Sequence, residues 1–215
     1  MSAGRVGIYG GTFDPPHLGH LALARLARDR FGLAETLFVP TLEPPHKQQP
    51  VASFAERCAM VDLALSTEPD CDRLACSRLE DDLPRPSYTI HTVRAVMARR
   101  APARFYLVIG MDSLEMLPQW HEAEALLRLV DLIAVNRDRA VPDAVREHVR
   151  RLRPEYAPMR GEVWINRAGR TLEIAGDFDA PFSSTAIRQA LARGESPPGL
   201  PGAALDYIRE HGLYT

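Results

Sequence analysis

Apolar positions along the chain follow two different periods. Short continuous apolar runs that end near Gly or Pro predict buried strands, and apolar residues recurring every three or four positions predict amphipathic helices. The predicted strands are Arg5–Gly10, Thr36–Pro40, Leu74–Leu79, Arg104–Gly110 and Asp131–Asn136. The predicted helices are His17–Phe31, one beginning at Ser53, Thr89–Arg100, one or two within Leu114–Leu129, Ser184–Arg193 and Ala203–His211. The pattern is weaker elsewhere, where it indicates a basic helix over Val141–Leu152 and one or two strands within Gly161–Ile174.

The alternation of strands and helices predicts an α/β fold built on a parallel sheet with helices on both faces. Such sheets bind ligands beyond the carboxyl ends of their strands. The segments richest in reactive side chains follow predicted strands in this way: Gly10–His20, Pro40–Lys47 and Gly110–Asp112. We therefore expect one binding site at this edge of the sheet.

Length and composition narrow the class of protein. The chain has 215 residues, which fits a single domain over 1–215, with residues 181–215 as a C-terminal helical part. A net charge of −2, from 26 basic and 28 acidic residues, argues against a general nucleic-acid coat. No apolar run reaches the roughly 20 residues that a membrane helix needs, and the N-terminal stretch lacks the layout of a secretory signal. Three cysteines without a C-x-x-C pair indicate neither a disulfide framework nor a zinc site, so we expect a cytoplasmic protein.

The segment GGTFDPPHLGH, residues 10–20, has the features of a phosphate-binding turn. Gly10 and Gly11 allow a sharp turn and a close approach to a ligand, and a helix start presents N–H groups and a positive dipole end to an anion. His17 and His20 are three residues apart and project from one face of the first turn, and Gly19 between them would let a phosphate or a base lie flat on the helix. The alternatives are two surface histidines, or a zinc site, for which no third ligand is evident.

The segment PFSSTAIR, residues 181–188, offers a second anion site. Ser183 and Ser184 are good N-caps for the helix that follows. Arg188 lies one turn further, and its planar guanidinium suits a phosphate. Ordinary capping together with a solvated arginine is the alternative for this segment.

The two segments together resemble the motifs of the nucleotidyltransferase superfamily. GGTFDPPHLGH resembles its H-x-G-H signature, and FSSTAIR resembles its I-S-S-T-x-x-R motif with Phe182 in place of the usual Ile. The resemblance implies a Rossmann-like doubly wound sheet and histidines that contact the ATP phosphates and stabilise the transition state. It also implies a C-terminal part that completes the ATP site. The implied ATP-binding residues are Gly10, Gly11, Thr12, Phe13, His17, Gly19, His20, Gly110, Asp112, Ser183, Ser184, Thr185 and Arg188.

Further segments resemble the bacterial nicotinate-mononucleotide adenylyltransferases in particular. The loop Val39–Lys47 is similar to their V-P-x-x-x-P-P-H-K loop, and its basic residue, Lys47, is implied to lie near the phosphates. Lys47 is the only lysine of the chain, and the alternative is a solvated loop lysine. Arg85–Thr89 resembles the family's R-x-S-Y-T turn, in which the helix start receives the nicotinate carboxylate, so that Tyr88 and Thr89 are implied substrate contacts.

Three more positions match the family between the two terminal motifs. Ile109–Asp112 resembles its I-G-x-D, whose aspartate approaches a ribose hydroxyl pair. Trp120 stands at the spacing of a tryptophan that stacks on the pyridine ring, with core packing as the alternative. Arg137 falls where the family often has a basic residue.

The resemblance implies direct transfer of an adenylyl group from ATP to nicotinate mononucleotide, without a covalent enzyme intermediate. The implied catalytic residues are His17, His20, Arg188 and Lys47, with Mg²⁺ carried by the ATP phosphates rather than by a protein cage. The nearest alternative is adenylylation of nicotinamide mononucleotide, and the next are phosphopantetheine adenylyltransferases and cytidylyltransferases. An inactive nucleotide-binding regulator is an alternative of another class. A nucleic-acid module built on the arginines of 137–153 is disfavoured by the acidic residues there, and a homo-oligomer stays open.

Overall fold

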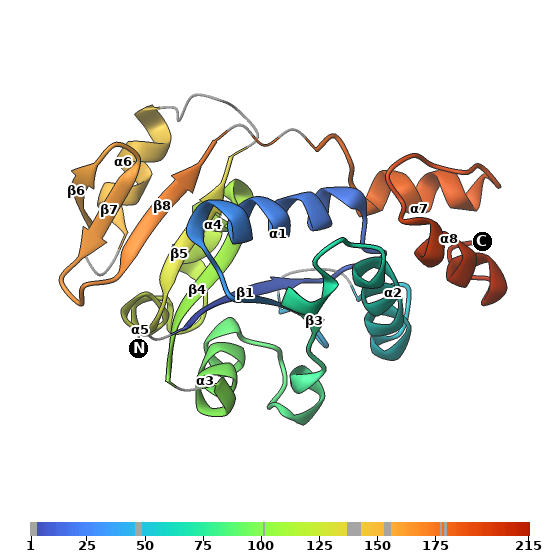
Figure 1. Ribbon diagram of the computed structural model, residues 1–215, viewed down its shortest axis with the longest axis horizontal. Coiled ribbons are helices and arrows are strands. Elements are labelled where there is room, and N and C mark those ends of the chain that lie inside the picture. The colour runs from blue at the N-terminus through green and yellow to red at the C-terminus, as the bar shows by residue number, and fades with distance from the viewer. Residues whose placement is uncertain are drawn as a thin grey trace.

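A computed structural model of the chain describes residues 4–45, 49–100, 102–136, 143–152, 156–176, 178 and 180–215. Its centre is an eight-stranded sheet with the strand order β3-β2-β1-β4-β5-β8-β7-β6 (Figure 1). The strands are β1 (Gly4–Gly11), β2 (Glu35–Pro40), β3 (Leu74–Cys76), β4 (Ala103–Gly110), β5 (Asp131–Val135), β6 (Tyr156–Arg160), β7 (Val163–Asn166) and β8 (Thr171–Ala175). The order of strands reverses between β1 and β4, which is the switch point where sheets of this kind bind ligands.

Eight α-helices lie within the described ranges, on both faces of the sheet and at its ends (Figure 1). They are α1 (Leu18–Phe31), α2 (Phe54–Ser66), α3 (Thr89–Arg100), α4 (Met111–Met116), α5 (Ala123–Leu129), α6 (Asp143–Arg151), α7 (Ser184–Ala192) and α8 (Gly202–Glu210). Short 3-10 helices cover Cys71–Arg73, Leu79–Asp82 and Leu117–Gln119. The predicted Rossmann-like α/β fold is confirmed.

Two apolar cores form because successive side chains of each strand point to opposite faces of the sheet. Ile8 and Leu107 point to the face covered by α3 to α6, whereas Tyr9 and Val108 point to the face covered by α1 and part of α2. Burying each such side chain contributes about 1.5–3 kcal/mol. The central strands are therefore covered on both faces, and this explains their continuous apolar runs.

The sheet departs from the all-parallel prediction at one edge. Strands β3, β2, β1, β4, β5 and β8 pair in parallel, but β7 pairs antiparallel with β8 and with β6. Only Gly161 and Glu162 separate β6 from β7, and a connection this short can join antiparallel strands but not parallel ones. Strand β6 was not predicted, because four of its five residues are exposed and leave no apolar pattern.

The predicted strand Leu74–Leu79 is wrong beyond Cys76. The amide of Ser77 still donates to the carbonyl of Phe38, at 2.8 Å, but the chain then turns into the 3-10 helix at Leu79. Leu79 is buried in the core on the α3 side. Its apolar side chain thus belongs to the core beneath a turn, and not to a longer strand.

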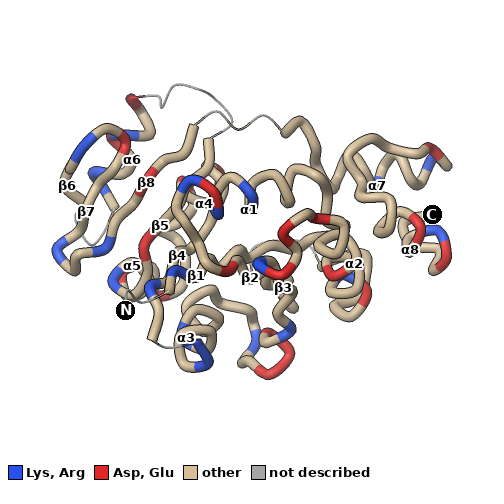
Figure 2. The backbone as a smooth tube through the Cα atoms, in the orientation of Figure 1, with Lys and Arg blue, Asp and Glu red and all other residues tan. Residues whose placement is uncertain are grey.

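Acidic and basic residues are interspersed along the backbone (Figure 2). On α6, the helix that was predicted to be basic, Arg146 pairs with Asp143 and Glu162, and Arg151 pairs with Glu147. These ion pairs offset the positive charge of that helix. Of the helices in the described part of the chain, none combines the length and the apolar character needed to cross a bilayer.

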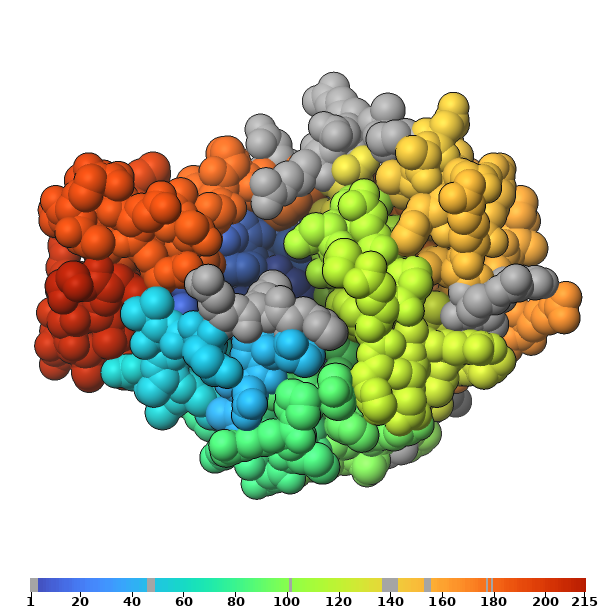
Figure 3. Space-filling view, turned by 180° about the vertical axis from the view of Figure 1, so that it is seen from behind, coloured from blue at the N-terminus to red at the C-terminus, as the bar shows by residue number. Residues whose placement is uncertain are grey.

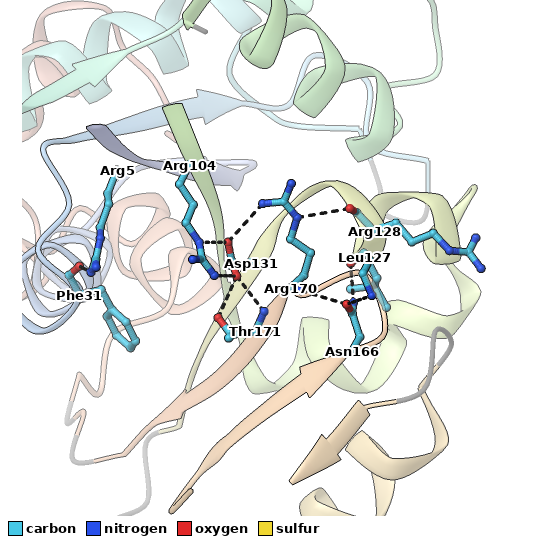
Figure 4. Close-up of polar contacts among 10 residues, drawn as sticks. Arg5, Phe31, Arg104, Leu127, Arg128, Asp131, Asn166, Arg170 and Thr171 are labelled. Atoms are coloured by element: carbon cyan, nitrogen blue, oxygen red, sulfur yellow. Dashed lines mark hydrogen bonds and ion pairs between the residues drawn. The ribbon is translucent and has the colours of Figure 1, made fainter. Parts of the chain in front are cut away.

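A buried carboxylate joins the amino ends of three neighbouring strands (Figure 4). Asp131, the first residue of β5, is fully buried and receives two hydrogen bonds from the guanidinium of Arg104, at 2.6 and 2.7 Å. The amide and hydroxyl of Thr171 donate to it as well, at 2.8 and 2.9 Å. Burial acts to raise the pKa of Asp131, but the bonds from Arg104 and Thr171 outweigh burial and hold this pKa below its usual value. The network lies at the opposite end of the strands from the predicted site.

Candidate active site

The predicted site residues that the structure describes lie at the carboxyl edge of the sheet, on either side of the switch point between β1 and β4. Strand β1 ends at Gly11 and strand β4 at Gly110, so that the turns after both strands open to the same edge. In the space-filling view, the blue N-terminal segment is set back in a hollow between the orange C-terminal segment and the yellow-green residues around α4 (Figure 3). This placement is the one expected for a ligand site in an open α/β sheet.

The two histidines of the first motif form a stacked pair. Their ring centroids are 3.6 Å apart and their planes are 16° from parallel. His17 is the N-cap of α1 rather than a residue of its first turn, and its backbone amide donates to Nδ1 of His20 at 3.1 Å. The buried Phe13 ring packs against His20 in a T-shaped contact, with centroids 5.0 Å apart. The expectation that both rings share one face of the helix start is confirmed.

This hydrogen bond determines which nitrogen of His20 carries the proton. Because Nδ1 accepts from an amide, the neutral ring has its proton on Nε2. A ring in this tautomer presents an N–H donor on the side away from the backbone, as a phosphate oxygen requires.

The glycines of the motif act differently from the expectation. Gly10 and Gly11 lie within β1, and the left-handed backbone of the turn is at Phe13, whose φ is 50°. A Cβ on Gly11 would stand 2.8 Å from the Phe13 ring, so this glycine makes room for a side chain rather than for a sharp turn. A Cβ on Gly19 would stand 3.0 Å from Nδ1 of His17 and 3.3 Å from Ala180. The space above Gly19 is therefore filled by protein.

The two terminal motifs are in direct contact, although they are about 170 positions apart. The hydroxyl of Ser184 donates to the carbonyl of Pro15 at 2.9 Å, and Nη1 of Arg188 donates to the carbonyl of Asp14 at 2.6 Å. The side chain of Arg188 is about 29% exposed, so it is only partly covered by the loop that it contacts. The convergence of both motifs on one loop is thus observed, and the C-terminal part contributes directly to this region.

A third side chain holds the same loop, and sequence reasoning missed it. Arg57 of α2 is almost completely buried, and its Nη1 donates to the carbonyl of Thr12 at 2.7 Å. Burial lowers the pKa of Arg57, and the nearby charge of Asp14 acts against this lowering. Arg57, Arg188 and Ser184 therefore fix three carbonyls of the loop between β1 and α1. The apolar pattern of α2 contained no signal that would have singled out Arg57.

At the starts of α1 and α7, some of the backbone amides that were expected to face a ligand are already hydrogen-bonded within the protein. The amide of Leu18, at the start of α1, donates to the carbonyl of Gly199 at 2.7 Å, so the C-terminal segment occupies this donor. At α7, Ser183 is the N-cap as predicted, and its hydroxyl accepts from the amide of Ala186 at 3.2 Å. Ser183 and Thr185 are both exposed beside this helix start.

The loop after β2 is attached to the R-P-S-Y-T turn. The amide of Glu43 donates to the hydroxyl of Ser87 at 3.1 Å, and the amide of Ser87 donates back to the carbonyl of Glu43 at 3.0 Å. Thr89 is the first residue of α3. Two segments that resemble motifs of the bacterial nicotinate-mononucleotide adenylyltransferases are thus neighbours. The predicted residues Lys47 and Arg137 lie outside the described residues.

Aromatic rings surround the start of α3. The half-buried Tyr88 ring stacks on His121, with centroids 4.2 Å apart and planes 23° from parallel, and His91 lies 6.0 Å from Tyr88. The neighbouring Trp120 is partly buried against the core on the α3 side. Neither histidine was expected here, since 30 residues of sequence separate them.

Gly110 and Asp112 lie on the other side of the switch point. Gly110 is the N-cap of α4, and Asp112 is exposed in its first turn. A Cβ on Gly110 would stand 2.7 Å from a carboxylate oxygen of Asp112, so the carboxylate lies back over the glycine at the end of β4. Within the described ranges, no three His, Cys, Asp or Glu side chains lie close enough together to hold a metal ion.

Comparison with known proteins agrees with this geometry. Residues 8–190 match the cytidylyltransferase-like family. A protein of Synechococcus sp. (strain JA-3-3Ab) named "probable nicotinate-nucleotide adenylyltransferase" is 41% identical over 98% of this chain and 94% of its own length. A protein of Aeromonas salmonicida with the same name is 36% identical over 97% of this chain and 96% of its own length.

A solved structure with the same overall fold is the nicotinic acid mononucleotide adenylyltransferase of Plasmodium falciparum in complex with NaAD. It aligns with a TM-score of 0.75 over 98% of this chain and 97% of its own, at 16% sequence identity. At that identity the likeness concerns the fold, whereas the curated relatives are similar in sequence over nearly the whole chain. The chain therefore belongs to the cytidylyltransferase-like family and, within it, to the group of the nicotinate-nucleotide adenylyltransferases.

Proposed function

We propose that the protein transfers the adenylyl group of ATP to the phosphate of nicotinate mononucleotide, giving nicotinate adenine dinucleotide and pyrophosphate. One observation carries the proposal: Ser184 and Arg188 of the closing motif contact the loop that leads into the stacked pair of His17 and His20. The names of relatives up to 41% identical over nearly the full chain support the choice of substrate.

The proposed chemistry is an in-line displacement. A phosphate oxygen of the mononucleotide forms a bond to the α-phosphorus of ATP, and the bond from that phosphorus to the bridging oxygen breaks, so that pyrophosphate leaves. The protein contributes position and charge stabilisation, and no covalent intermediate on it is needed. We assign the Nε2–H of His20 and the ring of His17 to the reacting phosphates. Arg188 is assigned to the ATP phosphates because its side chain is partly exposed beside the loop and its planar guanidinium suits a phosphate.

We assign the region around the amino end of α3, which is lined by aromatic side chains, as the binding site of the mononucleotide. The amino end of α3 at Thr89 suits a carboxylate, since first-turn amides and the helix dipole favour an anion. Tyr88 and Trp120 offer flat surfaces for a pyridine ring, and a cationic ring against an aromatic face is favoured by about 0.5–2 kcal/mol. Lys47 and Arg137 stay predictions for phosphate and substrate binding.

Mg²⁺ belongs to this proposal as part of the substrate, bound to the oxygens of ATP and then of pyrophosphate. Asp112 is assigned to the adenosine ribose, because its exposed carboxylate lies at the end of β4 beside the switch point. The other residues assigned to the ATP side are Gly10 and Gly11 of β1, Thr12 and Phe13 of the loop after it, Gly110 at the end of β4, and Ser183 and Thr185 at the start of α7. Gly19 of α1 takes part by leaving room for the His17 ring. A cytoplasmic location and a possible homo-oligomer remain predictions.

The decisive experiment is product analysis after mixing the protein with MgATP and either nicotinate or nicotinamide mononucleotide. We expect pyrophosphate and the deamido dinucleotide from the acid, with a kcat/KM at least about tenfold higher than that for the amide, which corresponds to about 1.4 kcal/mol. A preference for the amide would contradict the assignment of the carboxylate to the α3 start. Binding of ATP without release of pyrophosphate would instead favour a nucleotide-binding regulator.

A further inference from the structure

Asp14 lies where three distant parts of the chain meet. Its side chain is buried, and its two carboxylate oxygens accept from the amides of Val51 at 2.8 Å and Ala52 at 3.1 Å, just before α2. The backbone carbonyl of the same residue accepts from Arg188 at 2.6 Å. Asp14 thus connects the histidine loop, the start of α2 and the arginine of the closing motif.

The fourth contact of Asp14 comes from the segment after α8. The hydroxyl of Tyr214 donates to a carboxylate oxygen of Asp14 at 2.6 Å. The Tyr214 ring is buried in a small apolar cluster with Ala52, Met60 and Ile208. Burial, followed by the bond to Asp14, raises the pKa of Tyr214, so the phenol stays protonated and remains the donor.

Tyr214 has an unusual backbone conformation in the structure that makes this contact. Its φ is 63°, in the left-handed region that residues other than glycine rarely adopt. Such a conformation costs about 1–3 kcal/mol and persists where surrounding contacts hold it. Here those contacts are the apolar cluster and the bond to the buried carboxylate.

We propose that Tyr214 is a positioning residue for adenylyl transfer. It holds the carboxylate of Asp14, and Asp14 in turn holds the loop that leads into His17 and the guanidinium of Arg188. This inference rests on the proposed function, and it adds a residue that touches no reacting atom. Displacements of about 1 Å at reacting groups can reduce rates by about 100-fold, so a contact two steps away from the phosphates can control turnover.

The test compares Tyr214→Phe with Tyr207→Phe, each of which removes one hydroxyl and keeps the ring. Tyr207 lies on α8, stacks on His211 with centroids 3.9 Å apart, and packs against the same apolar cluster as Tyr214. Its hydroxyl makes no hydrogen bond to Asp14 among the described residues, so Tyr207→Phe removes a hydroxyl without touching the carboxylate. We expect Tyr214→Phe to lower kcat by about tenfold while KM for the mononucleotide changes less than about twofold. Tyr207→Phe should leave both constants unchanged. Assays run well below the melting temperature of each variant, so that a loss of folded protein does not enter kcat.

A second readout does not depend on turnover. Hydrogen exchange of the backbone amides within residues 10–20 should become faster in Tyr214→Phe, whereas exchange in β4 and β5 should not change. A change in only one of the two readouts, or in neither, overturns the inference. Faster exchange with unchanged kcat, for example, would make Tyr214 a purely structural residue.

The same experiment separates failure of the inference from failure of the proposed function. A wild-type protein that forms no dinucleotide refutes the proposed function, and affinity for ATP then replaces kcat as the first readout. If Tyr214→Phe does not fold, Asp14→Asn takes its place, because it keeps the size of the side chain but removes the charge that the phenol and both amides contact. Normal kcat and normal exchange in Asp14→Asn would equally overturn the inference.

Discussion

The backbone amide of His17 donates to Nδ1 of His20 at 3.1 Å, while the two imidazole rings stack 3.6 Å apart. The second ring is therefore oriented by the peptide group of the first, at the point where the loop becomes α1. Arg57, Arg188 and Ser184 hold the loop before this point by its carbonyls. A ring fixed in this way can act on developing charge without reorganising during the reaction, which is the condition for electrostatic catalysis.

His20→Ala should lower kcat by about 100- to 1,000-fold, while affinity for ATP falls only a few-fold. The reason is that the Nε2–H donor is expected to act on charge that develops mainly in the transition state. Steady-state kinetics at varied ATP, together with ATP binding measured by calorimetry, separate the two quantities. His211→Ala, which removes an exposed ring from the end of α8, is the control. Equal losses in kcat and affinity would make His20 a binding residue only.

Replacing a glycine of β1 by alanine tests whether ATP binds at the carboxyl end of this strand, without disturbing the fold. A Cβ placed on Gly4 or on Gly10 meets nothing within 4 Å, yet these two glycines stand at opposite ends of the strand. If ATP lies against the carboxyl end of β1, Gly10→Ala should weaken ATP binding by at least about tenfold, and Gly4→Ala should not change it. The free energy of unfolding of both variants should stay within about 1 kcal/mol of the wild-type value, because neither added methyl group creates a clash. Unchanged ATP affinity in Gly10→Ala would place the nucleotide elsewhere.

The centre of the sheet could be predicted from the sequence because of how it is covered. The middle residues of β1 and β4 are buried on both faces, so they form short unbroken runs without charged residues, and this pattern could be read in the sequence. The edges follow other rules. β3 is only three residues long, and the strand predicted there ran three residues too far, to Leu79. β6 exposes four of its five residues, so it left no apolar run and was missed.

The part of the candidate site that could be predicted is the part that depends on the type and spacing of side chains. The spacing of His17 and His20, and of Arg188 after Ser184, singled these residues out as candidates, and the nearness of the two motifs follows from the parallel sheet. The loop is held by hydrogen bonds to the backbone carbonyls of Thr12, Asp14 and Pro15. Every residue has such a carbonyl, so the residue types do not reveal which ones are bonded. For the same reason the hydrogen bond from the amide of Leu18 to the carbonyl of Gly199 could not be predicted.

Trp120→Ala should raise KM for nicotinate mononucleotide by about five- to twentyfold and leave KM for ATP within about twofold, since the lost ring-to-ring contact is worth about 1–2 kcal/mol. Trp120 also packs against the core, so folding of the variant has to be checked by its melting curve. Trp120→Phe is the matched comparison, because it keeps an aromatic face and should recover most of the affinity. A KM for the mononucleotide that does not move in Trp120→Ala removes this residue from the site.

Asp131→Asn should destabilise the protein at neutral pH by about 2–3 kcal/mol, as the charged hydrogen bonds from Arg104 and Thr171 are weakened. The pKa of Asp131 is lowered in the folded state, so its stabilising effect is complete above the unfolded pKa of about 3.9 and disappears as pH falls through the folded value. Urea unfolding of wild type and variant at a series of pH values measures the difference directly. The difference in the free energy of unfolding between the two proteins should be constant from about pH 7 to pH 5 and should become smaller below about pH 4.

The network of Asp131 lies at the amino ends of β4, β5 and β8, whereas the proposed chemistry lies beyond the carboxyl ends (Figure 4). Asp131→Asn should therefore keep kcat and both KM values near wild type at 25 °C, where the variant is still folded. Asp206→Asn, which neutralises an exposed carboxylate on α8, controls for the change of charge and should alter neither stability nor kinetics. A pH-independent difference in stability would mean that the charge of Asp131 contributes nothing, and that the side chain acts only through its shape.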